Sequence, residues 1–346
     1  MKKVISLVLS SVLALGVLAG CAAKTPAPTT PATPAPTAPV EATGFAKIGL
    51  GTITSIGKSK DVDVEKGATA QVDTVMLAAA FDKDGKIMEV LIDTAQTKVL
   101  FDKDMKLTSD VAAPIKTKQE LGADYGMGKV STIKKEWNEQ INAFADYIVG
   151  KTVAEVKALK LTEGVADDAE IKAFATIKLP DYVAALEKAL ANAVEVEAGA
   201  EKLGLGTKVS MAKSKSEEAD KAAVAQVDTV IIVTALDKDG KVAGATIDTA
   251  QTKVTYDIDG KLTSDLKATI KSKQELGADY GMGKVSTIKK EWNEQADAFA
   301  EYMVGKTVAE IKGLKLTEGV ADDAAIKAFA TIKLTDYITV LEEATK

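Results

Sequence analysis

An internal duplication constrains this chain more than any other feature. The tetrapeptide GLGT at 49–52 returns at 204–207, and the 23 residues at 118–140 recur letter for letter at 273–295. Both matches have an offset of 155 residues, and the copies align without insertion or deletion. A period this long exceeds the roughly 20–50 residues of solenoid repeats. We therefore predict two copies of one self-contained domain, at 46–192 and 202–346, joined by a short linker that lacks proline.

Within each copy the sequence predicts an α+β fold built on a small antiparallel sheet with packed helices. Residues 72–81 are strand-like, the sequence DKDG at 82–85 is typical of a hairpin turn, and 86–93 would form the return strand. The segment 98–107 repeats this strand–turn–strand pattern.

Three helices are expected after the strands. The first carries an apolar stripe made of Trp137, Ile141, Phe144 and Ile148. A capping box of Thr152 and Glu155 predicts the second, which is short. The last should begin at Pro180, because proline suits the first helical position. Its predicted buried stripe consists of Val183, Leu186 and Leu190.

The composition excludes several classes of function. The 346 residues include no histidine, no arginine and a single cysteine. Ser–His and Cys–His catalysis therefore lack their base, and zinc sites of His and Cys lack their ligands. A net charge of −6 without a basic stretch argues against nucleic acid as a partner. We expect a binding protein or an electron carrier rather than an enzyme, with no catalytic residue and no metal site.

The N-terminus has the pattern of a targeting segment. Lys2 and Lys3 precede a short apolar run, and the sequence LAGC at 18–21 resembles the lipobox of bacterial lipoproteins. The resemblance implies a signal peptide at 1–20, cleavage before Cys21 and a lipid on its sulfur, which would anchor the protein to the bacterial membrane on its extracytoplasmic side. An ordinary signal peptide, or a buried helix with a chance cysteine, is the alternative.

The segment 21–45 has the composition of a tether. It holds six of the chain's eight prolines, interleaved with threonine and alanine. Such a sequence cannot bury enough apolar surface to fold and favours polyproline II. We predict a lipid-anchored linker that holds the two copies away from the membrane.

Two recurring patterns have alternative readings. The sequence DIDG at 257–260 has the opening of a calcium loop, but the ligand pattern is incomplete and a solvated hairpin turn explains it. The GxG pairs at 49–51 and 204–206 would let a phosphate approach the backbone, but an ordinary turn is favoured.

Glycines beside an aromatic ring and a thioether suggest a flat apolar slot for a planar ring. The sequence YGMG occurs at 125–128 and again at 280–283, which makes Tyr125, Met127, Tyr280 and Met282 candidate binding residues. Trp137 and Trp292 could stack there, although their place on the apolar stripe favours a role in the core.

The last candidate is the sequence AFATIK at 173–178, which recurs at 328–333 directly before the final helix. Here the chain resembles the bacterial FMN-binding domain family, which is similar in its order of strand, Asp-Gly hairpin, lysine-rich Tyr-x-Met segment and helix. Family members have Ser/Thr-Gly-Ala-Thr at this place, and the final threonine accepts FMN through a phosphoester. The resemblance therefore implies Thr176 and Thr331 as attachment sites, with FMN installed by a separate flavin transferase.

The motif departs from the family pattern at two positions. Ala173 and Ala328 replace the hydroxyl residue, and Phe174 and Phe329 replace the glycine. Phe174 and Phe329 would instead serve as walls of a flavin site. The resemblance implies a membrane-anchored lipoprotein that passes electrons to a redox partner outside the cytoplasmic membrane. The alternative is a cofactor-free lipoprotein that binds a small solute or an envelope protein.

Overall fold

The computed structural model describes residues 44–219 and 221–346. The predicted α+β class with antiparallel sheets and packed helices is confirmed. The predicted signal peptide, Cys21 and the linker as far as residue 43 lie outside the described residues. Phe45, assigned above to the linker, is buried, and its N–H donates to the carbonyl of Ala200 at 2.7 Å.

Each copy contributes one antiparallel sheet. In the first copy, β3 (Gly67–Phe81) pairs with β1 (Lys47–Ser55), β2 (Lys60–Asp63) and β4 (Ile87–Phe101). The short β7 (Val194–Glu195) extends this sheet beside β1. In the second copy, β9 (Val224–Asp237) lies between β8 (Ala200–Ser210) and β10 (Val242–Thr255).

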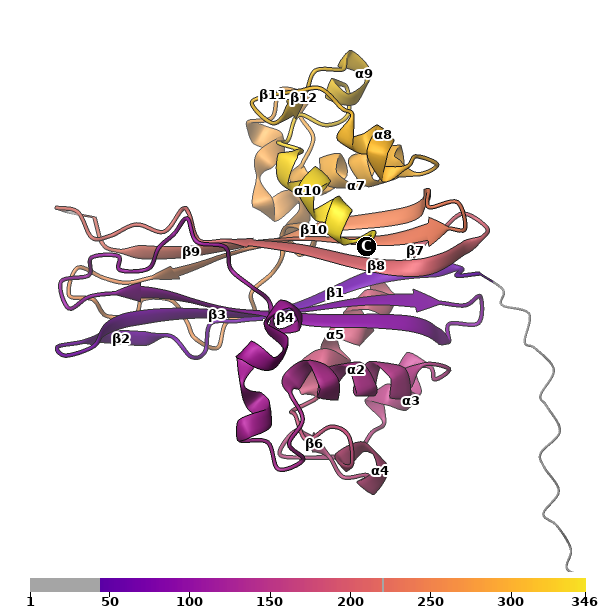
Figure 1. Cartoon of the computed structure of the whole chain (residues 1–346). Coiled ribbons are helices and arrows are strands. Elements are labelled where there is room, and N and C mark those ends of the chain that lie inside the picture. The colour runs from indigo at the N-terminus through magenta and orange to yellow at the C-terminus, as the bar shows by residue number, and fades with distance from the viewer. Residues whose placement is uncertain (1–43, 220) are drawn as a thin grey trace, which may run out of the picture. The chain divides into compact units, whose positions relative to one another are not determined.

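The helices of each copy cover the outer face of its own sheet (Figure 1). Those of the first copy are α1 (Lys118–Leu121), α2 (Trp137–Ile148), α3 (Val153–Lys157), α4 (Ala169–Lys172) and α5 (Pro180–Ala191). Those of the second are α6 (Lys273–Leu276), α7 (Trp292–Met303), α8 (Val308–Lys312), α9 (Ala324–Lys327) and α10 (Thr335–Glu343). Two-residue strands form a small hairpin in each copy: β5 (Leu161–Thr162) with β6 (Val165–Ala166), and β11 (Leu316–Thr317) with β12 (Val320–Ala321).

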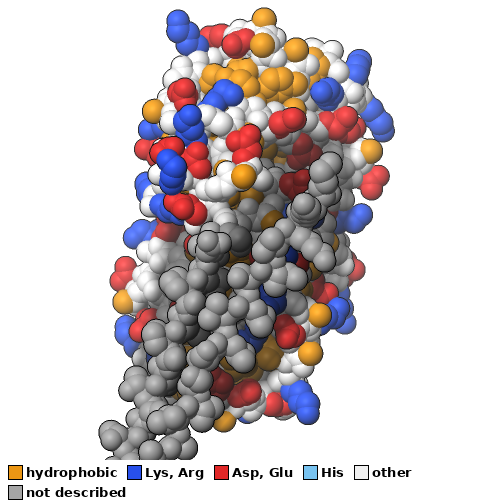
Figure 2. Space-filling view, turned by 90° about the vertical axis from the view of Figure 1, so that its right-hand side faces the viewer, with side chains coloured by type: hydrophobic (Ala, Val, Ile, Leu, Met, Phe, Trp, Pro, Cys, Tyr) orange, Lys and Arg blue, Asp and Glu red, His pale blue; other side chains and the backbone are white. Residues whose placement is uncertain are grey.

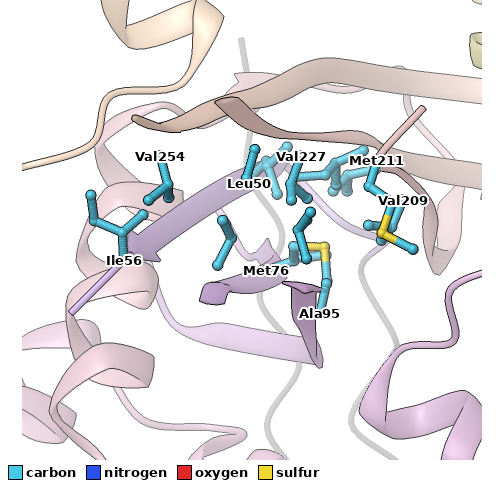
Figure 3. Packing of buried hydrophobic residues seen from close by; sticks show 14 of the residues in the cluster. Leu50, Ile56, Met76, Ala95, Val209, Met211, Val227 and Val254 are labelled. Atoms are coloured by element: carbon cyan, nitrogen blue, oxygen red, sulfur yellow. The ribbon is translucent and has the colours of Figure 1, made fainter. Parts of the chain in front are cut away.

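The inner faces of the two sheets pack on each other through one shared apolar layer (Figure 3). Side chains alternate along β3, so that Met76 joins this layer while Leu77 faces the helices. The shared layer includes Leu50 and Ala95 from the first copy and Val209, Met211, Val227 and Val254 from the second. Because β3 is buried on both faces, its second half, residues 75–81, is apolar throughout and does not alternate.

The described residues of the two copies, 44–219 and 221–346, therefore form one compact unit. Each copy has its own core between sheet and helices, and a third core, between the two sheets, belongs to both copies. Backbone groups also bond across the interface: Leu203 N–H donates to Glu89 Oε2 at 3.1 Å, and Leu262 N–H donates to Asp61 Oδ1 at 2.7 Å. Where the sequence favoured two self-contained domains, the structure shows two similar folds that share an interior.

Two local expectations differ from the structure, and a third, the hairpin turn at 257–260, is confirmed. The GLGT segments are neither turns nor phosphate loops, because they lie within β1 and β8. Of the two hairpins predicted over 72–107, the one that turns at 82–85 forms, whereas 98–101 ends the long β4 and Leu107 makes a single bridge to Phe101. The DIDG turn is a hairpin turn in which Asp257 Oδ1 accepts the N–H groups of Asp259 and Lys261 at 3.0 and 2.8 Å.

The buried stripe of the last helix is also shifted by one residue. In α5 the buried positions are Tyr182, Ala185, Leu186 and Ala189, whereas Leu190 is exposed. The reason is a close helix–strand contact: a Cβ placed on Gly51 would lie 1.8 Å from the carbonyl oxygen of Ala185. Glycine in the strand and alanine in the helix allow the two backbones to touch.

Candidate functional site

The predicted attachment threonines lie in the loop before the last helix of each copy. Thr176 follows α4 and precedes α5, and Thr331 holds the same place between α9 and α10. Both residues are half-buried, and Thr331 lines a cleft.

A buried glutamine holds each threonine. Gln295 Oε1 accepts the N–H of Thr331 at 2.8 Å and its hydroxyl at 3.2 Å, and Gln140 does the same for Thr176 at 2.9 and 3.3 Å. The amide nitrogen of Gln295 donates to the carbonyl of Lys290 at 2.9 Å and to Ser286 Oγ at 3.3 Å. Both glutamines have no exposed surface. Each glutamine therefore links the loop that contains the threonine to the loop before its own helix, which follows the Tyr-x-Met segment at 125–127 or 280–282.

A cleft of about 490 Å3 opens beside Thr331 in the second copy. Its apolar wall consists of Val230, Met282, Trp292 and Ile332. Four lysines surround it: Lys208, Lys213, Lys273 and Lys333. The cleft thus brings together Thr331 and Met282, two of the binding residues predicted from the sequence, whereas Lys208, Lys213 and Lys273 were not singled out there.

The lysines differ in how their charge is balanced. Lys208 pairs with Asp336 at 2.6 Å and Lys213 pairs with Asp228 at 2.7 Å. Within 44–219 and 221–346, no carboxylate pairs with Lys273 or Lys333. Two uncompensated ammonium groups beside a threonine hydroxyl suit an anionic ligand such as a phosphate.

The aromatic residues are not arranged as open stacking surfaces. Lys273 Nζ lies 4.8 Å from the ring centroid of Tyr280 and 5.2 Å from that of Trp292. The hydroxyl of Tyr280 donates to Gln251 Oε1 at 3.3 Å. The Trp292 ring is a core residue, only 1% exposed, with its Nε1 donating to the Tyr337 hydroxyl at 3.2 Å. A planar ligand would reach these faces only after Lys273 moves.

The two phenylalanines of the motif do not line the cleft. Phe329 packs against Tyr302 with ring centroids 5.9 Å apart, and Phe174 packs against Tyr147 at 5.7 Å. Phe329 is half-buried at the edge of the second copy's helix-side core, as Phe174 is in the first. The predicted walls Phe174 and Phe329 are thus packing residues in this structure.

The first copy repeats most of this arrangement. Lys58 pairs with Asp73 at 2.8 Å, and Lys118 Nζ lies 4.8 Å from the Tyr125 centroid and 5.2 Å from that of Trp137. The Tyr125 hydroxyl donates to Gln96 Oε1 at 3.1 Å, and Met127 Sδ lies 3.5 Å from the amide nitrogen of Gln140. The principal difference is Ile53, which stands at the position of Lys208.

A buried hydroxyl in the first copy lacks a partner. Thr94 Oγ1 forms no hydrogen bond among the described residues. Its counterpart Thr249 lines the cleft of the second copy and reaches the Tyr337 hydroxyl only at 3.5 Å. Burial raises the pKa of Tyr337, so its hydroxyl stays protonated and able to donate. A ligand in the second copy's cleft with an acceptor oxygen would satisfy the hydroxyls of Thr249 and Tyr337.

These observations fit the phosphate end of FMN more closely than its ring. Thr331, Lys333 and Lys273 offer a hydroxyl and two cations to a phosphate, while Val230, Met282 and Ile332 offer apolar contact. Within 44–219 and 221–346 no cluster of three acidic or cysteine side chains could hold a metal ion, and no helix there is long and apolar enough to cross a membrane. On the face shown in Figure 2, lysines and acidic residues are interspersed.

Comparison with known proteins adds no family. The chain matches no protein-family model, and neither a curated protein nor a solved structure matches it. The resemblance to the FMN-binding domain family therefore stays a prediction from the sequence, and the geometry of the cleft carries the functional argument.

Proposed function

We propose that this chain is a lipid-anchored, extracytoplasmic protein of a bacterial membrane that binds FMN in the cleft beside Thr331 and carries electrons to a redox partner. The anchoring part rests on the sequence of residues 1–21. The binding part rests on one observation: a cleft of about 490 Å3 that combines a threonine hydroxyl, an apolar wall and two lysines without a paired carboxylate.

The chemistry of the donors supports a phosphorylated ligand. Lys333 and Thr331 come from the same loop and would hold the phosphate, and Lys273 would leave the face of Trp292 to meet it. The flavin supplies the electron transfer when bound, whereas the protein supplies orientation and charge. The absence of histidine suits a carrier that needs no proton-transfer residue.

We propose noncovalent binding. Phenylalanine stands where the FMN-binding family has glycine, and Phe329 packs against Tyr302 away from the cleft. The Thr331 hydroxyl already donates to Gln295. A phosphoester at this oxygen would replace that hydrogen bond and would require the separate flavin transferase.

The absorbance of the purified protein tests this proposal. A bound flavin gives an absorbance band at roughly 450 nm, which is a property of the isoalloxazine ring. We expect the band after addition of FMN and its loss on unfolding. Retention after unfolding would show covalent attachment, which Thr176→Ala and Thr331→Ala would then assign. A colourless protein that ignores added FMN would refute the proposal.

A cofactor-free binding protein is the second candidate. The observation that favours it is the position of Lys273, whose ammonium covers the rings of Tyr280 and Trp292. In that case the cleft would bind a small anionic solute, and inorganic phosphate would compete for it while riboflavin would not. If the partner is instead an envelope protein, neither phosphate nor riboflavin would bind in the cleft.

A further inference from the structure

Two cavities lie where the copies meet. The larger, about 620 Å3, is bounded by β4, α1 and α2 of the first copy and by β8 and the end of α10 of the second. The smaller, about 280 Å3, is bounded by the corresponding elements with the copies exchanged. Asp93, Gln119 and Glu120 in the larger cavity correspond to Asp248, Gln274 and Glu275 in the smaller. The two cavities are therefore versions of one site.

In the smaller site, an ammonium group of the protein itself binds the glutamate. Lys188 on α5 reaches across the interface and donates to Glu275 Oε1 at 2.5 Å and to the carbonyl oxygen of Thr52 at 2.9 Å. Its side chain is 30% exposed and that of Glu275 is 24% exposed, so the pair is partly withdrawn from water. A primary ammonium is thus the group that these acceptors bind.

The larger site has the acceptors without the lysine. Position 343, which corresponds to Lys188, holds glutamate. Glu120 repeats the role of Glu275, because its Oε2 accepts the N–H of Thr117 at 2.7 Å as Glu275 Oε2 accepts that of Ser272 at 2.8 Å. Thr207 lines the cavity at the position of Thr52. No lysine pairs with Glu120 among the described residues.

The lining of the larger site suits a cation with an aliphatic body. Four acidic side chains face it, namely Asp93, Glu120, Asp146 and Glu343, against the single lysine Lys346. Val90, Ile92 and Leu205 supply apolar wall. Burial raises the pKa of Asp93, and a bound cation would favour its ionised form. The described residues contain no acidic cluster able to hold a metal ion, which favours an ammonium.

We propose that this cavity binds a primary alkylammonium compound of the aliphatic diamine or polyamine class, with one ammonium beside Glu120 where Lys188 Nζ lies in the other site. The acidic side chains that remain hold the second ammonium. This site is separate from the cleft beside Thr331 and does not depend on a flavin.

Isothermal titration of the full chain with cadaverine tests the proposal, with 1,5-pentanediol as the uncharged control. We expect one diamine per chain, weaker binding at high salt and no heat from the diol. Glu343→Lys supplies the ammonium that the smaller site has, so it should weaken cadaverine binding at least tenfold while leaving the thermal midpoint unchanged or higher. Glu120→Gln removes one charged acceptor and should weaken binding by about tenfold.

Two results would overturn the proposal. One is the absence of cadaverine binding to the unaltered protein up to about 10 mM, a weak-binding limit. The other is binding that Glu343→Lys and Glu120→Gln leave unchanged, which would mean a nonspecific attraction to surface acids. If Glu343→Lys does not fold, Glu120→Gln and Glu343→Gln decide, since both keep the size of the side chain.

Discussion

Replacing the buried glutamine behind Thr331 with leucine should destabilise the protein strongly. Gln295→Leu keeps the size of the side chain but removes the acceptor for the Thr331 N–H at 2.8 Å and the donor to the Lys290 carbonyl at 2.9 Å. A buried polar group left without a partner costs about 1–3 kcal/mol. Thr331 and Lys290 are only half-buried, so water recovers part of this cost. We expect a net loss of about 2–4 kcal/mol.

The assay is urea unfolding followed by tryptophan fluorescence, which reports on Trp137 and Trp292. The duplication supplies a matched control, because Gln140 makes the same bonds at 2.9 Å to Thr176 and at 2.9 Å to Lys135. Gln140→Leu should therefore lose a similar free energy. A loss below about 0.5 kcal/mol, the range of ordinary surface substitutions, would refute the reasoning. So would a large difference between the two variants.

Two further predictions concern burial and close packing. Burial raises the pKa of Asp248 to about 6 from 3.8. The unfolded chain therefore releases this proton at lower pH than the folded one, and stability falls as the pH rises from about 4 to about 6. At pH 7 the Asp248→Asn variant should have a free energy of unfolding roughly 3 kcal/mol higher than the unaltered protein, and it should lack this part of the pH dependence. Urea unfolding of both proteins at pH 4 and pH 7 measures this difference. A variant whose stability depends on pH as that of the unaltered protein does would contradict the prediction. Gly204→Ala should cost about 3 kcal/mol or more, because its Cβ would lie 1.6 Å from the Ala344 carbonyl oxygen. Gly57→Ala, whose Cβ has no neighbour nearer than 3.4 Å, is the control, and equal thermal midpoints would contradict the packing argument.

The sequence correctly predicted helices that are marked by residues close together in the chain. The capping box at Thr152 and the proline at the start of α5 mark helices that the structure contains. The stripe from Trp137 to Ile148 is the buried face of α2. These patterns determine conformation through neighbours three or four residues away, so they can be recognised without the rest of the fold.

Features that depend on distant packing were missed. The glycines of β1 resembled a turn because the reason for them, the contact with α5, lies about 140 residues away. The apolar layer that the two sheets share could not be predicted from the sequence of either copy alone. Its signal was the apolar sequence of residues 75–81, too continuous for a strand with one solvated face.

The candidate site was predicted in part. Thr331 and Met282 line one cleft, but Phe329 does not. Gln295 was missed although it is a polar residue on the apolar stripe of α7, which is a usable signal for a buried hydrogen-bonding role. The lysines of the cleft come from β8, the following loop, α6 and the threonine loop, so no spacing along the chain could group them.

A comparison of FMN with riboflavin tests the central claim most directly. The two ligands share the flavin ring and differ in the phosphate that Lys333, Lys273 and Thr331 are proposed to hold. Titration of the full chain, followed by quenching of flavin fluorescence, should give an affinity for FMN at least tenfold higher than for riboflavin, as expected for a charge-assisted hydrogen bond. Lys333→Met should abolish most of that difference. Equal affinities for the two ligands, or binding of neither, would contradict the account.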